Sequence, residues 1–211
     1  MADNSPVLYL FPAPLWPGTA DTFLTDAHRA VIRDVRVIAS ENSHRTAAYF
    51  SSVHKSWRAA SCVFFDLKSR EPSEIQEFLE AAKEAGAGLL VSDAGMPCVA
   101  DPGHLFVRRA HEQGFRTVPL PGPVSLMLAL AASGLQGQNF CFRGYPPSQP
   151  EALSRHVKKL AQEIMSGVTL IYMEAPQRNR SFFDALIKNL PAEAYLCVAS
   201  ALQSPSAFIV T

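Results

Sequence analysis

The sequence has few charges and no long apolar run. Lys and Arg total 19, Asp and Glu total 19, and charged residues make up 18% of the 211 positions, against ~25% in ordinary soluble domains. The even balance argues against a polybasic nucleic-acid binder. No stretch approaches the ~20 apolar residues that a membrane helix needs, and the polar start with Asp3 is unlike a signal peptide. We expect a cytoplasmic protein with no membrane-spanning segment.

Cysteine is scarce, and its spacing is uninformative for metal or disulfide chemistry. The four cysteines are Cys62, Cys98, Cys141 and Cys197, with no C-x-x-C pair. Such wide spacing predicts neither a disulfide framework nor a thiolate metal site. The six histidines lack metal-ligand spacing as well, so we expect no bound metal.

The common nucleotide and hydrolase motifs are missing. The chain has no G-x-G-x-x-G after a strand, no G-x-x-x-x-G-K-[ST] and no G-x-S-x-G. The first β-rich run leads instead into residues 12–18, PAPLWPG. These absences argue against a standard Rossmann dinucleotide site, an NTPase, the commonest methyltransferase fold and an α/β hydrolase.

What the sequence does contain is an alternation of strand-like and helix-like patterns. In the first part, β-rich runs at 7–11, 35–39, 62–65, 88–92 and 117–120 are separated by helical patterns at 21–33, 42–53, 73–86 and 104–113. Asn42 is placed to cap one of these helices, and Ser73 with Gln76 forms an S-x-x-Q capping box for another. Alternation of this kind predicts an α/β fold with largely parallel sheets.

The pattern restarts after a Pro-rich segment at 119–123. Helical patterns at 123–134, 151–165 and 181–190 alternate with strand-like runs at 140–143, 168–173, 195–199 and 207–210. We therefore predict two α/β domains, residues 1–119 and residues 120–211. A strand that stops one residue before the end of the chain has no following element, so we expect the second domain to be cut short.

The most informative segment is 91–103, VSDAGMPCVADPG, which follows a predicted core strand. Ligands of open α/β sheets bind at the carboxyl ends of strands, and small residues let the backbone approach a ligand closely. Asp93 and Asp101 add two carboxylates. An equally good interpretation is a simple turn in which both aspartates cap nearby N–H groups.

Three further segments have a plain structural explanation for some or all of their residues. Residues 119–125, PLPGPVS, are typical of a stiff turn and a helix start. Residues 171–178, IYMEAPQR, could hold an aromatic ring and a polar substrate, or simply a core methionine and a surface ion pair. In residues 40–46, SENSHRT, helix capping explains Asn42 and Ser43 but does not require Glu41 or Arg45.

Taken together, these segments resemble the tetrapyrrole methylase superfamily, and most closely its ribosomal RNA small-subunit methyltransferase I branch. That branch reads roughly V-S-D-A-G-T-P-x-x-S-D-P-G, P-x-P-G-P-S-A and Y-E-S-P-H-R, similar to 91–103, 119–125 and 172–178 here. Its A-E-D-T-R motif is similar to residues 40–44. The motifs occur in order from Leu8 to about Val198, which is nearly the whole chain.

The resemblance implies two α/β domains of the tetrapyrrole methylase type, with S-adenosyl-L-methionine in the cleft between them, and a homodimer. It implies a cofactor-binding set by motif position: Pro14, Ser92, Asp93, Ala94, Gly95, Met96, Val99, Val124, Ser125, Met173 and Leu202.

The chain also departs from the family pattern. Met96 replaces Thr, Ala100 replaces Ser, Asn42 replaces Asp and Gln177 replaces His. The late R-E-L-T-K segment reads SALQS at 200–204, which removes three charged residues near the expected substrate side.

The expected reaction is ribose 2′-O-methylation of small-subunit ribosomal RNA. A base would help to remove the hydroxyl proton, and Glu41, Asp101 and Glu174 are the candidates. Arg45 and Arg178 would bind phosphate. A basic run at 155–159 is either an RNA contact or a solvated helix face. Two alternatives stay open: methylation of a tetrapyrrole or another small molecule, and a non-catalytic S-adenosylmethionine-binding protein.

Overall fold

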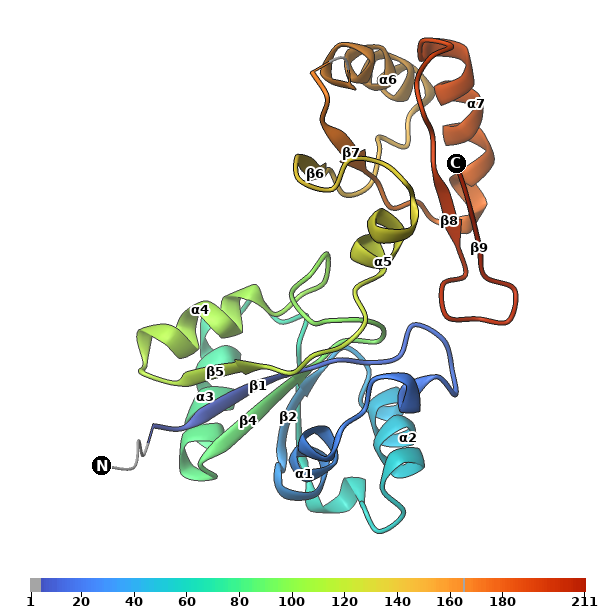
Figure 1. Ribbon diagram of the computed structural model, residues 1–211. Helices are drawn as coiled ribbons and strands as arrows, with labels where there is room; N and C mark the ends of the chain where they lie inside the picture. The colour runs from blue at the N-terminus through green and yellow to red at the C-terminus, as the bar shows by residue number, and fades with distance from the viewer. Residues whose placement is uncertain (1–4, 165) are drawn as a thin grey trace. The chain divides into compact units, whose positions relative to one another are not determined.

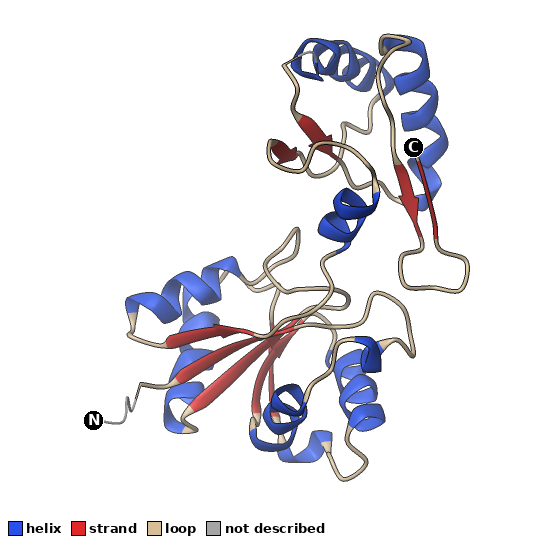
Figure 2. Ribbon diagram, viewed as in Figure 1, coloured by secondary structure: helices blue, strands red, loops and turns tan. Residues whose placement is uncertain are grey.

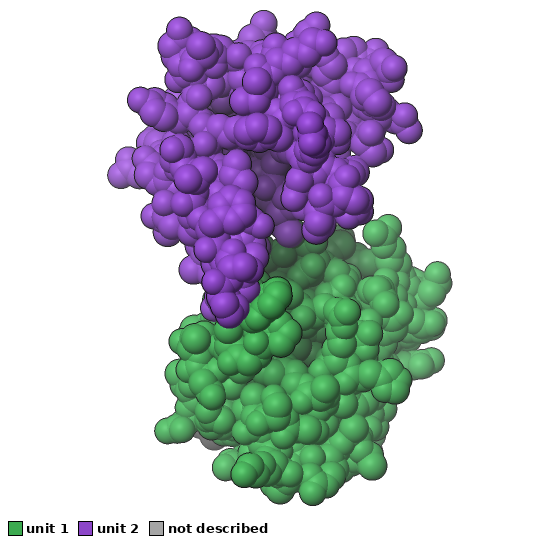
Figure 3. All heavy atoms as spheres, turned by 90° about the vertical axis from the view of Figure 1, so that its right-hand side faces the viewer, with its two compact units in different colours: residues 1–124 green, residues 125–211 purple. Residues whose placement is uncertain are grey.

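The computed structural model describes residues 5–164 and 166–211. The chain divides into two compact units, residues 1–124 and 125–211 (Figure 3). The sequence analysis sets the boundary at 119/120, whereas here the whole Pro-rich segment belongs to the first unit.

Unit 1 is built on one parallel sheet of five strands. In spatial order the strands are β3 (Val63–Asp66), β2 (Val37–Ser40), β4 (Ala87–Val91), β1 (Val7–Phe11) and β5 (Arg116–Pro119). Every pairing is parallel. β2 and most of β4 are buried along their length, as expected for a parallel sheet covered on both faces.

Helices cover both faces of this sheet (Figures 1 and 2). Residues of α1 (Asp26–Asp34) and α2 (Ser43–Val53) share one apolar cluster with Phe11 and Ile38. Those of α3 (Pro72–Glu84) and α4 (His104–Glu112) share the other cluster with Leu8. Each face of the sheet is thus covered by its own pair of helices and its own apolar cluster.

The strand order creates a topological switch point between β1 and β4. The connection after β1 passes through α1 to β2, and the connection after β4 passes through α4 to β5, on the opposite face and in the opposite direction. Loops that leave neighbouring strands in opposite directions open a crevice at the carboxyl ends, where α/β sheets bind ligands.

The first residues of three helices in unit 1 can be compared with those predicted from the sequence. Asn42 caps α2 as predicted, because its side chain accepts a hydrogen bond from the Arg45 N–H. The predicted helix at 21–33 is wrong in extent: a 3-10 turn, η1 (Ala20–Thr22), precedes α1, whose start is fixed by a capping box of Thr25 and His28. The predicted capping box of Ser73 is also wrong. α3 begins at Pro72, whose missing N–H and fixed φ suit a first helical position.

Unit 2 is smaller in its sheets and in its core. Its elements are α5 (Ser125–Ala132), β6 (Phe140–Phe142), α6 (Pro150–Ile164), β7 (Thr169–Ile171), η3 (Pro176–Arg178), α7 (Asn179–Asn189), β8 (Val198–Ser200) and β9 (Phe208–Val210). β6 and β7 pair in parallel, but β8 and β9 form an antiparallel pair rather than a parallel one. Leu153, Val157 and Leu186 form its apolar cluster, between α6 and α7. Among residues 5–164 and 166–211, no helix is long and apolar enough to cross a membrane.

Candidate cofactor and acceptor site

The loops after β1 and β4 are joined directly at the switch point. Ala13 and Gly95 form an antiparallel bridge. The Ala13 N–H donates to the Gly95 carbonyl at 2.8 Å, and the Gly95 N–H donates to the Ala13 carbonyl at 2.9 Å. This reciprocal pair fixes the 92–99 loop relative to residues 12–15, so the main chain of both loops is held at the expected ligand-binding edge.

The conformation of Gly95 favours glycine at this bridge, and its nearest neighbours come from two other segments. Its φ is +76°, where side chains are strained. A Cβ atom there would lie 3.4 Å from both Leu15 Cδ2 and the Pro123 carbonyl oxygen. The position is therefore a close approach of three backbone segments.

The third segment is the Pro-rich stretch 120–123. The Leu120 N–H donates to the Leu10 carbonyl at 3.0 Å, and a side chain at Gly122 would overlap the Pro12 ring. Pro123 is buried. Residues 12–15, 92–99 and 120–123 thus make a backbone-lined structure, which we call the cradle.

Ser92 and the residues after Gly95 complete the main cradle loop. The Ser92 hydroxyl is buried and lies 3.3 Å from the Ala94 carbonyl oxygen and 3.5 Å from that of Gly95. Cys98 and Ala100 have φ of 69° and 63°, a conformation costly for side-chain-bearing residues and often found at functional sites. Met96 is half-buried and Val99 is exposed.

A polar network joins the ends of β2, β3 and β4 beside the cradle. Glu41 Oε1 accepts the Asp93 N–H at 2.9 Å, and Arg45 Nη1 lies 2.9 Å from Asp93 Oδ2. Asp93 is thus bound to Arg45 rather than capping a neighbouring N–H. The network brings together Glu41, Arg45 and Asp93, three of the residues singled out from separate motifs.

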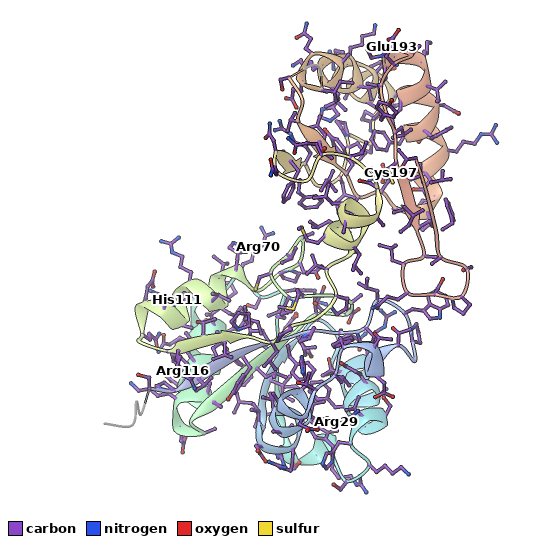
Figure 4. All side chains as sticks on the ribbon, viewed as in Figure 1. Arg29, Arg70, His111, Arg116, Glu193 and Cys197 are labelled. Carbon is purple, nitrogen blue, oxygen red and sulfur yellow. The ribbon has the colours of Figure 1, made fainter. Side chains whose placement is uncertain are left out.

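Lys68 belongs to the same network, although the sequence analysis did not single it out. Its Nζ donates to the Glu41 carbonyl at 3.0 Å. Lys68 lies on the loop after β3, which also carries the exposed Arg70 (Figure 4). The available signal was topological: β3 pairs with β2, so charged residues after one strand adjoin those after the other.

Among the described carboxyl groups, Asp101 has a pKa that departs strongly from its ordinary value. Burial raises the pKa of Asp101 to about 6, the negative charges of Glu41 and Asp93 raise this pKa further, and a hydrogen bond from Ser92 opposes the shift. An acid with a pKa near 6 is largely ionised at neutral pH yet can still accept a proton in a reaction.

In unit 2, Glu174 and Arg178 bind each other. The Glu174 side chain is 9% exposed, forms an ion pair with Arg178 Nη2 and accepts the Ala175 N–H at 2.7 Å. Arg178 remains 30% exposed. The 174–178 motif therefore contains an ion pair, as the second interpretation of this segment predicts, but the Glu174 carboxylate is almost buried rather than on the surface.

The other expected cofactor positions occupy element ends. Pro14 is half-buried in the loop after β1, and Val124 is the last residue of unit 1. Ser125 begins α5, and the Met173 N–H donates to the Gly144 carbonyl at 3.0 Å, just beyond β7. Leu202 sits in the turn from β8 to β9.

The basic run at 155–159 lies on α6. In the basic run of α6, the His156 ring already has a partner within the protein, because its Nε2 lies 2.9 Å from the Tyr172 hydroxyl. Arg155, Lys158 and Lys159 are exposed.

Among the described residues, no group of three His, Cys, Asp or Glu side chains is arranged to hold a metal ion.

Comparison with known proteins assigns this chain to a family. The family described as Tetrapyrrole (Corrin/Porphyrin) Methylases matches residues 18–202. Several relatives carry the name ribosomal RNA small subunit methyltransferase I. The protein of Escherichia coli O157:H7 is 32% identical over 203 residues, covering 95% of this chain and 67% of the relative. The Haemophilus influenzae protein is 30% identical over 199 residues, 94% of this chain and 67% of the relative.

A third relative of the same name, from Xylella fastidiosa, is 46% identical over 89 residues, or 42% of this chain and 32% of the relative. The matched residues thus cover about two thirds of the length of the E. coli and H. influenzae relatives and about a third of the X. fastidiosa relative. The family match covers most of the chain, including the cradle loop, the Pro-rich segment and the 174–178 motif. The chain belongs to the tetrapyrrole methylase family.

Proposed function

We propose that this protein is an S-adenosyl-L-methionine-dependent methyltransferase that methylates a ribose 2′-hydroxyl of small-subunit ribosomal RNA. The observation that carries the proposal is the cradle, a set of three backbone segments fixed at the switch point of a parallel sheet. The names of the relatives support the choice of ribosomal RNA as acceptor.

The cradle suits the proposed cofactor in its chemistry. The small residues Ala94 and Gly95 let a nucleoside come close to the main chain of the loop, while the side chains of Met96 and Val99 offer apolar contact. Residues proposed to bind the cofactor in unit 1 are Pro14, Ser92, Asp93, Ala94, Gly95, Met96, Val99 and Val124. For Ser125, Met173 and Leu202 the proposal rests on motif resemblance.

When bound, the cofactor supplies a methyl group on a positively charged sulfur, so the leaving group needs no activation. The protein then has to orient the acceptor and accept its proton. We assign the proton to a carboxylate oxygen of Asp101. Its partial burial and the adjacent carboxylates of Glu41 and Asp93 make the ionised form costly, and taking up the hydroxyl proton relieves that cost.

The other two candidate bases are engaged elsewhere. Glu41 Oε1 is bound to the Asp93 N–H, so it orients the loop beside the cradle. Glu174 is bound to Arg178 and to the Ala175 N–H, and proton uptake there would break an ion pair. Asp101 is therefore the proposed base, with Glu41 in a positioning role.

Phosphate groups of the RNA would bind the exposed cations near the cradle. The Arg45 side chain is 70% exposed while held by Asp93, so its remaining N–H groups can contact a phosphate. Lys68 and Arg70, on the loop after β3, add two exposed positive charges. Arg178 is the proposed contact in unit 2, sharing its guanidinium with Glu174.

A homodimer acting in the cytoplasm completes the proposal. Unit 2 exposes several large apolar side chains, among them Phe183, Ile187, Phe208 and Val210, and such surfaces usually mark a protein interface. The family resemblance supports two copies of this chain as the partners.

The test is transfer of labelled methyl groups from S-adenosylmethionine to small ribosomal subunits that lack their native modification, beside a panel of porphyrinoids. We expect label in ribose of the ribosomal RNA, and loss of that label with Asp101→Asn. Label in the porphyrinoids alone would support the tetrapyrrole alternative. Cofactor binding in calorimetry without transfer to either acceptor would support the non-catalytic one.

A further inference from the structure

His28 is a fully buried histidine with both ring nitrogens in use. It lies in the first turn of α1, with a relative exposure of 0%. Nδ1 accepts the Thr25 N–H at 3.2 Å and lies 2.8 Å from the Thr25 hydroxyl, while Nε2 lies 2.8 Å from the Pro121 carbonyl oxygen.

These partners determine where the ring carries its hydrogen. A backbone N–H can only donate and a carbonyl oxygen can only accept. Nδ1 is therefore unprotonated, and Nε2 carries the hydrogen that it donates to Pro121. Burial lowers the pKa of His28, which favours this neutral form. The ring is also packed edge-on against Phe11 and Phe23, with centroids 5.5 Å and 6.0 Å away.

The Pro121 carbonyl belongs to the 120–123 arm of the cradle. Immediately after it, Gly122 lies against the Pro12 ring, and the Pro123 carbonyl lies against the position where a Gly95 side chain would begin. The arm is rich in proline, and proline has no N–H to donate. Pro121 and Pro123 therefore cannot anchor the arm by donating a backbone hydrogen bond, and the bond that His28 donates to the Pro121 carbonyl anchors it from outside.

We propose that His28 is a positioning residue for the cofactor site: its Nε2–H bond to Pro121 holds the 120–123 arm in the cradle beside Gly95. The inference rests on the proposed function, because it assumes that the cradle binds S-adenosylmethionine. It assigns His28 two separable tasks, capping α1 through Nδ1 and holding the arm through Nε2.

Two substitutions separate these tasks. In His28→Asn, the side-chain oxygen can occupy the place of Nδ1 and accept the Thr25 N–H, but no donor reaches Pro121. In His28→Gln, the longer side chain can place an amide N–H near the position of Nε2 and restore the bond to Pro121. The first variant keeps the helix cap and loses the arm contact, and the second keeps the arm contact.

The experiment measures S-adenosylmethionine affinity by calorimetry for the wild type and both variants, with urea unfolding of each and steady-state methyl transfer. For H28N we expect about tenfold weaker cofactor binding, as for loss of one buried hydrogen bond. The KM for the cofactor should rise while the KM for the ribosomal subunit stays unchanged. H28Q should bind within about threefold of the wild type, since one hydrogen bond is exchanged for another.

Wild-type affinity in a folded H28N protein would overturn the inference. So would an affinity loss in H28Q of tenfold or more, and this second criterion holds even if H28N fails to fold. A wild-type protein that binds no S-adenosylmethionine would overturn the proposed function, and the inference with it, before either variant is compared.

Discussion

The two units differ in how completely each buries its apolar side chains. Unit 1 encloses its parallel sheet between two clusters that contain large fully buried rings such as Phe11, Phe50, Phe78 and Phe106. In unit 2 the described cluster contains three buried residues, and large apolar side chains on α7 and β9 remain exposed.

This difference separates a unit with a large buried core from a unit with a small one. The cradle is anchored entirely within unit 1, so its geometry depends on a core that is already complete. Burial of apolar surface stabilises a fold by roughly 25 cal/mol per Å², whereas exposed apolar patches are typical of binding surfaces. Core mutations in unit 1 should therefore lower the free energy of unfolding strongly. Mutations of the exposed apolar side chains of unit 2 should instead affect the binding of a second copy of the chain.

The largest effect should come from emptying the core of unit 1. Phe78 is fully buried and packs edge-on against Phe65 and Phe106, with centroids 5.5 Å and 5.3 Å away. Phe78→Ala should lower the free energy of unfolding by about 3–5 kcal/mol in urea denaturation. The control is Phe183→Ala in unit 2, where the ring is 44% exposed and a cost under ~1 kcal/mol is expected. Equal costs would contradict the contrast between the units.

The next effect compares the candidate bases of the two units. Asp101→Asn should reduce kcat at least about 100-fold, as for loss of a general base. In the wild type the rate should rise with pH up to about 6 and then level off, because the pKa of Asp101 is raised to about 6. Glu174→Gln in unit 2 should leave that pH profile in place. A pH step that persists in Asp101→Asn, or disappears in Glu174→Gln, would transfer the role to another group.

Asp101 also predicts a change in stability with pH. Its pKa is higher in the folded protein than its ordinary value of 3.8, so the folded state binds the proton more tightly. Stability should therefore fall as pH rises from about 4 to about 6. Asp101→Asn should remove this fall and raise the melting temperature at pH 7.5, measured by calorimetry across the range. An unchanged pH dependence would mean that Asp101 titrates normally.

A smaller effect tests the cradle within unit 1 alone. Gly95→Ala places a side chain at φ +76° beside Leu15 and Pro123, whereas Gly114→Ala introduces the same φ strain where nothing lies within 4 Å. Both should lose about 1–2 kcal/mol of stability. Only Gly95→Ala should weaken S-adenosylmethionine binding, by tenfold or more in calorimetry. Equal affinities in the two variants would remove Gly95 from the cofactor site.

The smallest effect on stability should come from the exposed face of unit 2. Ile187 and Phe208 are 66% and 52% exposed, so replacing both with Ser should change the free energy of unfolding of the monomer by less than about 0.5 kcal/mol per site. If this face joins two copies of the chain, the same change should shift sedimentation from dimer to monomer. A dimer that persists would place the interface elsewhere.

Most of unit 1 could be predicted from the sequence because its signals are local. Apolar runs mark β1 to β5, and Asn42 marks the start of α2. The helix predicted at 21–33 failed because apolar spacing alone does not reveal that His28 caps the helix from its third position. Unit 2 was harder, because its strands are only three residues long and periodicity has little to act on.

By itself the sequence determined the class of fold, the family and the segments that carry the chemistry, since these depend on residue type and order along the chain. Only the tertiary structure decided which of those residues act together. Glu41, Lys68, Asp93 and Asp101 come from three different loops, and parallel pairing of β3, β2 and β4 brings their loops to one edge. The pairing of Glu174 with Arg178 and the raised pKa of Asp101 depend on burial and on neighbouring charge, which no local pattern records.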